Sequence, residues 1–347
     1  QKASIAMEII QVKGKISEST IIVGESISNL SKYIPGKGVY IITDENVDKL
    51  YGDKFPNYPK IVVKAGEASK NLLSVSEIYR WLLDAGADRS SFIVGIGGGV
   101  VCDIAGFVAS TYMRGVEFGF VATSLLAQVD ASVGGKNGVD LDGYKNIIGT
   151  FNQPKFVICD TSMLKTLPVV ELSNGFAEMV KHCLIADAAD FAFMENNIEK
   201  LMQCDVEVIT PLLAKSVRIK ANIVTADENE KGERKKLNLG HTWGHAVEKV
   251  SGLPHGQSVS IGLELSARLS TEKGLLEKRD YMRLMNLLRE LQLPICTSIN
   301  PLKIFDALTK DKKKVDDSID FILMKGIGNV VIERLPLNEI KSYLVKG

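Results

Sequence analysis

Residues 92–107 read FIVGIGGGVVCDIAGF, and this stretch decides the fold. The apolar run 92–96 predicts a buried strand, and the pattern of residues 104–107 predicts one face of a helix. Glycines 97–99 lie at the junction, where they allow a tight turn and a close approach of backbone N–H groups to a diphosphate at the helix N-terminus. Because the pattern is not the G-x-G-x-x-G fingerprint, a purely structural turn is an equally good interpretation of this stretch alone.

Strand and helix patterns alternate on either side of this stretch. Short apolar runs predict strands at 39–43, 61–64, 118–122 and 156–159, and residues 72–85 predict an amphipathic helix. This alternation of strands and helices is typical of βαβ units, which form a parallel sheet.

Two polar segments strengthen the interpretation of a dinucleotide site. Residues 43–46 (TDEN) follow the first of these strands, and residues 66–70 (GEASK) follow the next. Like the glycine-rich turn, they lie at the carboxyl ends of parallel strands, where open α/β sheets bind ligands. A carboxylate in the first segment is suited to bind ribose hydroxyls.

The second half of the chain is predicted to be mainly helical. Helical patterns cover 191–202, 206–225, 241–250, 257–273 and 278–291, and a late β-hairpin is expected from 321–324 and 330–333. We place the boundary near Leu167-Pro168. The predicted fold class is therefore α/β, with a Rossmann-like, parallel-sheet domain (1–168) and a mainly α-helical domain (169–347). We expect the first to be a dinucleotide-binding (NAD-binding) domain and the second to be a metal- and substrate-binding domain.

Three of the four histidines fall within fifteen residues: His241, His245 and His255. Spaced i, i+4 on a helix, the first two share one face and suit a divalent metal such as zinc, although paired core or capping histidines are the alternative. Catalytic zinc needs a third protein ligand. The residues alone leave it open between His255, His182 and a carboxylate, and they favour an exposed helix position for Glu178.

Composition excludes several classes of protein. The 347 residues are 45% hydrophobic and carry 42 basic and 42 acidic side chains, so no charge excess attracts nucleic acid or an anionic membrane. The five cysteines are scattered without CxxC spacing, which argues against a disulfide framework and favours a reducing cytoplasm. No apolar run approaches the roughly 20 residues that span a bilayer.

Basic residues recur beside glycine and asparagine along the chain. The positions are Arg114, Lys136, Lys145, Lys181, Lys220, Arg234 and the pair Lys312-Lys313. Each alone is more often a solvated surface charge, but together they predict a pocket for a small polyanion with phosphate or carboxylate groups. A redox cofactor, a metal and such a pocket indicate oxidation of an alcohol on an acidic sugar.

Several separated motifs occur in one order: GGGVVCDIAGF, YMRG, SLLAQVDASVGGKNGVD, YKNIIGTFNQP, FAEMVKH, DENEKGERKKLNLGHTWGHAVE and DKKK. With them the chain resembles the 3-dehydroquinate synthase family of the sugar-phosphate cyclase superfamily. The resemblance implies zinc or cobalt held by Glu178, His241 and His255. It places His245 beside the metal as a hydrogen-bonding or proton-transfer partner, so the i, i+4 pair need not both be ligands.

The resemblance also implies the residues that bind NAD and substrate. For NAD they are Asp44, Asn46, Glu67, Lys70, Gly98, Gly99, Val100, Asp103, Thr123, Ser124, Lys136, Lys145, Leu164, Lys165 and Thr166. For the anionic sugar phosphate they are Arg114, Asp130, Lys136, Asn146, Lys181, Lys220, Arg234, Asn238, His245 and one of Lys312 and Lys313. Family members are commonly dimers, so a homodimer is expected.

The family's reaction converts 3-deoxy-D-arabino-heptulosonate 7-phosphate to 3-dehydroquinate and phosphate. It proceeds by transient oxidation with NAD, β-elimination of phosphate, re-reduction, ring opening and an intramolecular aldol, so no net redox occurs. A sister cyclase acting on sedoheptulose 7-phosphate or glucose 6-phosphate is the nearest alternative. Those substrates lack the carboxylate, and the presence of Lys220, Arg234 and Asn238 favours the acidic one. A glycerol dehydrogenase-like alcohol dehydrogenase, which would accumulate NADH, and a non-enzymatic metal-binding or scaffold protein are more distant alternatives.

Overall fold

A computed structural model of the chain describes residues 7–14, 18–131, 133–227, 232–310 and 317–346. The chain forms two compact units, Gln1–Leu167 with Cys204–Thr225, and Pro168–Gln203 with Ala226–Gly347. Helix α7 (Val206–Ala226) thus groups with the first unit, although a continuous second domain was expected from residue 169 onward. Of the helices described, none has the length and apolar character needed to span a membrane.

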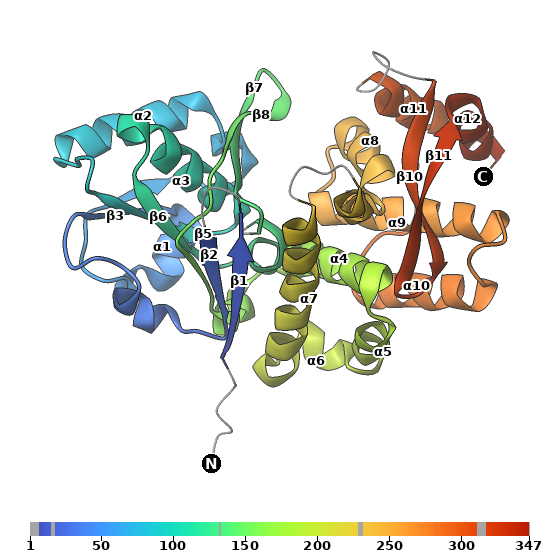
Figure 1. Cartoon of the computed structure of the whole chain (residues 1–347), viewed down its shortest axis with the longest axis horizontal. Helices are drawn as coiled ribbons and strands as arrows, with labels where there is room; N and C mark the ends of the chain where they lie inside the picture. The colour runs from blue at the N-terminus through green and yellow to red at the C-terminus, as the bar shows by residue number, and fades with distance from the viewer. Residues whose placement is uncertain (1–6, 15–17, 132, 228–231, 311–316, 347) are drawn as a thin grey trace. The chain divides into compact units, whose positions relative to one another are not determined.

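A seven-stranded sheet forms the centre of the first unit (Figure 1). Its strands, in spatial order, are β1 (Glu8–Lys13), β2 (Glu18–Val23), β9 (Phe156–Cys159), β6 (Glu117–Ala122), β5 (Phe92–Gly97), β3 (Val39–Asp44) and β4 (Lys60–Val63). All neighbours pair in parallel except β1 and β2, which are antiparallel. The predicted parallel sheet is confirmed, while β1 and β2 are additions that the sequence patterns did not predict.

Both faces of this sheet are covered by helices. Successive strand residues point to opposite faces, so each strand packs on both sides. On one face, Ile41 and Ile96 pack with Tyr51 of α1 (Glu45–Tyr51) and with the 3₁₀ helix η1 (Ile27–Lys32). On the other face, a Cβ at Gly95 would lie 2.8 Å from the Cβ of Ala105 in α3 (Gly99–Thr111), which contacts α2 (Leu72–Asp84). The arrangement is Rossmann-like, as predicted.

The order of the strands reverses between β3 and β5. The chain passes from β3 outward to β4 and then crosses to β5 on the other side of β3. Open α/β sheets bind ligands at the carboxyl ends of their strands at such a point. The glycine-rich turn after β5 and Asp44 at the end of β3 meet there.

The shorter elements of the first unit are the hairpin β7 (Lys136–Leu141) and β8 (Tyr144–Phe151) and the turns η2 (Gly52–Lys54), η3 (Glu67–Ser69), η4 (Tyr112–Arg114), η5 (Ala127–Ala131) and η6 (Thr161–Thr166). In the second unit the helices are α4 (Val169–Ala186), α5 (Ala188–Asn196), α6 (Ile198–Met202), η7 (Glu233–Asn238), α8 (His241–Ser251), α9 (His255–Glu272), α10 (Lys278–Glu290), α11 (Pro301–Lys310) and α12 (Leu337–Lys346).

A β-hairpin of β10 (Ser318–Gly326) and β11 (Asn329–Pro336) packs against these helices, with the ring of Phe321 centred 4.9 Å from that of Trp243 in α8. This late hairpin was predicted and is confirmed. The single helix predicted over 191–202 is wrong, because the chain forms α5 and α6 with a break at Asn197.

Glycines bring α4, α8 and α9 into backbone contact. A Cβ at Gly262 of α9 would lie only 1.9 Å from the carbonyl oxygen of Gly240, the N-cap of α8. A Cβ at Gly256, also in α9, would lie 2.4 Å from the Cα of Asn174 in α4. These close approaches fix the positions of the three helices that carry Glu178, His241 and His255.

Candidate active site

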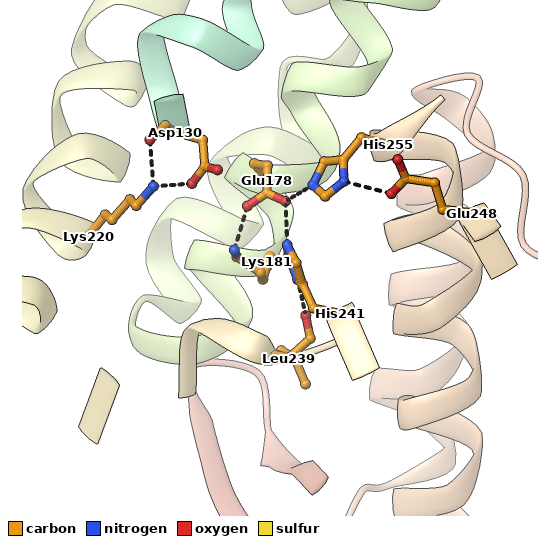
Figure 2. A network of polar contacts seen from close by, with 8 residues as sticks. All are labelled: Asp130, Glu178, Lys181, Lys220, Leu239, His241, Glu248 and His255. Atoms are coloured by element: carbon orange, nitrogen blue, oxygen red, sulfur yellow. Dashed lines mark hydrogen bonds and ion pairs between the residues drawn. The ribbon is translucent and has the colours of Figure 1, made fainter. Parts of the chain in front are cut away.

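Three donor atoms converge in the second unit. The Oε1 atom of Glu178 lies 3.2 Å from His241 Nε2 and 3.4 Å from His255 Nε2 (Figure 2). All three donor atoms lie within 4.8 Å of one another. Tetrahedral ligands at the usual zinc distance of about 2.0–2.1 Å are separated by about 3.4 Å. The spacing therefore fits a single divalent ion.

Glu178 is fully buried, so the expectation of an exposed helix glutamate is wrong. The helix α4 is buried continuously from Leu172 to Ile185, with Glu178 in the middle of this stretch. Lys181, one turn along, places its Nζ atom 2.5 Å from Glu178 Oε2. Burial alone would raise the pKa of Glu178, but Lys181 and His241 outweigh it and hold the pKa well below its usual range. The Glu178 carboxyl group is therefore ionised and can serve as an anionic metal ligand.

Each histidine of the group has its second nitrogen engaged. His241 Nδ1 lies 3.2 Å from the carbonyl oxygen of Leu239, and His255 Nδ1 lies 3.2 Å from Glu248 Oε2. A proton on Nδ1 of each ring would satisfy these two contacts, and Nε2 of each ring faces Glu178. This is the arrangement found around metal-binding histidines.

The two rings differ in protonation. Burial and the Lys181 charge lower the pKa of His241, which is therefore neutral. Burial also lowers the pKa of His255, but its hydrogen bonds to Glu178 and Glu248 outweigh this and raise it to about 10. In the metal-free protein, His255 therefore carries the proton that a divalent ion would displace.

His245 is not part of the convergent group. Its ring is centred 5.3 Å from that of His241 and 6.2 Å from that of His255. The group of donor atoms within 4.8 Å of one another therefore consists of Glu178, His241 and His255, and not of the i, i+4 pair. Glu178 and His255 approach His241 from α4 and α9, whereas His245 lies one turn further along α8.

In the first unit, the candidate NAD residues gather at the carboxyl ends of the strands. Gly98 is the N-cap of α3 and makes no side-chain hydrogen bond to the first N–H groups of the helix, which include those of Gly99 and Val100. A Cβ at Gly98 would lie 3.3 Å from the hydroxyl of Ser124, which follows β6. The preceding Thr123 donates its N–H to Gly97 O at 2.9 Å.

Asp44 lies at the neighbouring strand end and caps α1. Its Oδ1 atom accepts hydrogen bonds from the N–H groups of Asn46 and Val47, both at 2.9 Å. In η6, after β9, Leu164 is buried and Lys165 is exposed. The Thr166 hydroxyl lies 2.6 Å from the Tyr51 hydroxyl.

A charge cluster lies beside this turn. Lys70 Nζ is 3.1 Å from Glu67 Oε1 and 3.3 Å from Asp103 Oδ2, and Lys145 Nζ is 4.0 Å from Glu67. Burial would lower the pKa of Lys70, but Asp103 and Glu67 raise it, so the ammonium stays charged. Burial raises the pKa of Asp103 to about 6, although the positive charge of Lys70 acts to lower it. A buried cation is thus held in place by two carboxylates.

The substrate candidates belong to both units. In the first, Lys220 of α7 donates to the backbone oxygen of Asp130 at 2.6 Å and pairs with its carboxylate (Figure 2). Lys136 and Asn146 lie on the β7–β8 hairpin. Arg114 is exposed at the opposite end of α3 from the glycine-rich turn, about 20 Å along the helix.

In the second unit, Arg234 is buried and Asn238 ends η7, while Lys181 lies beside Glu178. Lys312 and Lys313 fall outside the described residues. Sequence reasoning did not single out Glu248. The sequence does carry an indication of its role, because Glu248 follows His241 by seven residues, a spacing that places the two side chains on one face of α8.

Comparison with known proteins identifies the family. Residues 60–174 match the family 3-dehydroquinate synthase N-terminal, and residues 175–314 match 3-dehydroquinate synthase C-terminal. The chain is 40% identical over 329 residues to the 3-dehydroquinate synthase of Alkaliphilus metalliredigens (strain QYMF), covering 92% of each chain. The chain belongs to the 3-dehydroquinate synthase family. It is therefore an enzyme, and the resemblance read from the motifs is confirmed.

The chain is also similar to a second 3-dehydroquinate synthase and to a solved structure of another cyclase. The enzyme of the same name from Geotalea uraniireducens (strain Rf4) is 43% identical over 277 residues, 79% of this chain and 77% of the relative. The solved structure of ValA, a 2-epi-5-epi-valiolone synthase from Streptomyces hygroscopicus subsp. jinggangensis 5008 with NAD+ and Zn2+ bound, superposes with a TM-score of 0.86. It is 26% identical and covers 97% of this chain and 98% of its own.

Proposed function

We propose that this enzyme converts 3-deoxy-D-arabino-heptulosonate 7-phosphate to 3-dehydroquinate and phosphate, as a carbon–oxygen lyase that uses NAD and one zinc or cobalt ion. The observation that carries the proposal is the convergence of Glu178, His241 and His255 in a chain that is 40% identical to a 3-dehydroquinate synthase.

Glu178 Oε1, His241 Nε2 and His255 Nε2 would hold the metal. Three protein ligands leave a coordination position open to substrate, as catalytic zinc sites require. When bound, the ion would polarise a substrate hydroxyl, and NAD would accept and return a hydride. Lys181 holds the second carboxylate oxygen of Glu178, so that only Oε1 faces the histidines.

NAD would bind at the reversal of strand order in the first unit. The N-terminus of α3 offers backbone N–H groups to the diphosphate. Asp44 has one carboxylate oxygen engaged in capping α1 and would bind ribose hydroxyls with the other. The other proposed NAD residues are Asn46, Glu67, Lys70, Gly98, Gly99, Val100, Asp103, Thr123, Ser124, Lys136, Lys145, Leu164, Lys165 and Thr166.

Cationic and amide side chains, together with the His245 imidazole, would anchor the phosphate and carboxylate of the substrate. We assign this role to Lys136, Asn146 and Lys220 of the first unit and to Lys181, Arg234, Asn238 and His245 of the second. The cation of Lys220 is already oriented by Asp130, so little side-chain entropy is lost on binding. Arg234 is buried, where a fixed guanidinium suits bidentate recognition of a carboxylate.

The similarity to a 2-epi-5-epi-valiolone synthase makes a sister cyclase the second candidate. The two candidate functions are distinguished by the substrate that the enzyme accepts. Purified enzyme with catalytic NAD and zinc is supplied with either 3-deoxy-D-arabino-heptulosonate 7-phosphate or sedoheptulose 7-phosphate, and phosphate release is measured. We expect release from the acidic substrate alone. Release from sedoheptulose 7-phosphate alone would assign the enzyme to the sister activity.

A further inference from the structure

A carboxylate outside the ligand group holds one of its histidines. Glu248 Oε2 accepts a hydrogen bond from His255 Nδ1 at 3.2 Å (Figure 2). The side chain of Glu248 is 11% exposed and that of His255 is 28% exposed, so the contact is largely shielded from solvent. A hydrogen bond to a shielded charged acceptor is stronger than one in water.

The contact joins two consecutive helices. Glu248 lies seven residues after His241 and three after His245, so all three side chains lie along one face of α8. His255 is the first residue of α9. One helix face therefore carries a candidate metal ligand and also the carboxylate that orients a ligand from the next helix.

Helix stability does not account for this pair. Glu248 lies in the last turn of α8, where the helix dipole disfavours a negative charge. The contact that accounts for the position of the Glu248 carboxylate is the one with His255 Nδ1 at 3.2 Å. That contact holds the His255 ring in place at the start of α9.

We propose that Glu248 is a positioning residue of the metal centre. Its carboxylate fixes the proton of His255 on Nδ1 and holds the ring so that Nε2 faces Glu178 Oε1 at 3.4 Å. This inference rests on the metal site of the proposed function. Partners that orient metal-binding histidines in this way typically contribute about 10- to 100-fold to metal affinity.

Zinc affinity tests the assignment without relying on turnover. The dissociation constant is measured in the full chain by competition with a chromophoric chelator, for the parent and for Glu248→Ala and Glu248→Gln. The matched control is Glu290→Ala, which removes an exposed glutamate from the end of α10 in the same unit. Urea unfolding of the zinc-free proteins reports any structural effect separately.

Glu248→Ala should weaken zinc binding by about 10- to 100-fold. Glu248→Gln should recover most of the affinity, because its amide oxygen still accepts the Nδ1 proton, and Glu290→Ala should match the parent. With cobalt in place of zinc, the visible absorption bands should shift in Glu248→Ala only.

Parent-like zinc affinity in Glu248→Ala would overturn the inference. If that variant does not fold, Glu248→Asp decides, because its shorter side chain withdraws the carboxylate from His255. Weaker zinc binding by Glu248→Asp supports the inference and parent-like binding overturns it. A parent protein that binds no zinc would refute the proposed metal site itself, so the two failures are distinguishable.

Discussion

The contact of Gly262 with the first turn of α8 offers a sharp test of how the metal centre is built. In Gly262→Ala, the new Cβ would lie 1.9 Å from Gly240 O and 2.8 Å from Gly244 N. Since real Cβ contacts are essentially never shorter than 3.0 Å, the two helices must separate by about 1.1 Å. Both neighbours are backbone atoms, so no side-chain rotation relieves the clash.

Such a separation has two measurable effects. Overpacking of this kind costs about 1–3 kcal/mol of unfolding free energy, and the upper end applies when backbone must move. It also moves His241 relative to His255 by far more than the tolerance of about 0.2 Å in metal–ligand distances. We therefore expect Gly262→Ala to lose both stability and stoichiometric zinc.

Zinc content after dialysis, measured by mass spectrometry, and the urea unfolding midpoint give the two readouts. Gly36→Ala is the control, because a Cβ there would meet nothing within 4 Å. A Gly262→Ala protein with the zinc content and stability of the parent would refute the argument that close packing of α8 on α9 sets the ligand geometry.

Two further predictions concern the first unit. Asp44→Ala removes the acceptor for the N–H groups of Asn46 and Val47 and should cost about 1 kcal/mol of unfolding free energy. NAD titration should show weaker binding to the same variant, and unchanged NAD affinity would argue against a ribose contact. Burial raises the pKa of Asp103 to about 6 in the folded protein, above its ordinary value of 3.8, so folding favours the protonated carboxyl. The stability from this group is present below pH 3.8 and is lost as the pH rises through 6. The parent should therefore lose up to about 3 kcal/mol relative to Asp103→Asn over this window. Urea unfolding of both NAD-free proteins across this pH window measures the difference. The same change of unfolding free energy with pH in both proteins would contradict the prediction.

The sequence predicted the sheet because its strands are short apolar runs with helices between them. One hairpin that it did not predict includes a strand with a weak pattern. In β8, Tyr144, Ile147 and Phe151 are exposed, so the strand shows no alternation between buried apolar and exposed polar positions. The hairpin β7–β8 that carries Lys136 and Asn146 was therefore not expected.

The metal group was only partly predictable from residues. The clustered histidines indicated a metal site. Helical periodicity, however, relates residues within one helix and does not predict which helices pack against one another. The burial of Glu178 depends on packing around α4, and the glycines that allow it lie far along the chain. The family motifs supplied the ligand set that spacing left open, and the geometry of the second unit agrees with that set.

The most direct test of the central proposal is turnover of 3-deoxy-D-arabino-heptulosonate 7-phosphate with catalytic NAD, with and without a metal chelator. Phosphate, 3-dehydroquinate and NADH are followed together. We predict equal amounts of phosphate and 3-dehydroquinate, no accumulation of NADH, and loss of turnover with chelator that zinc or cobalt restores. Accumulation of NADH without phosphate release, or turnover that the chelator leaves unchanged in metal-free protein, would contradict the proposal.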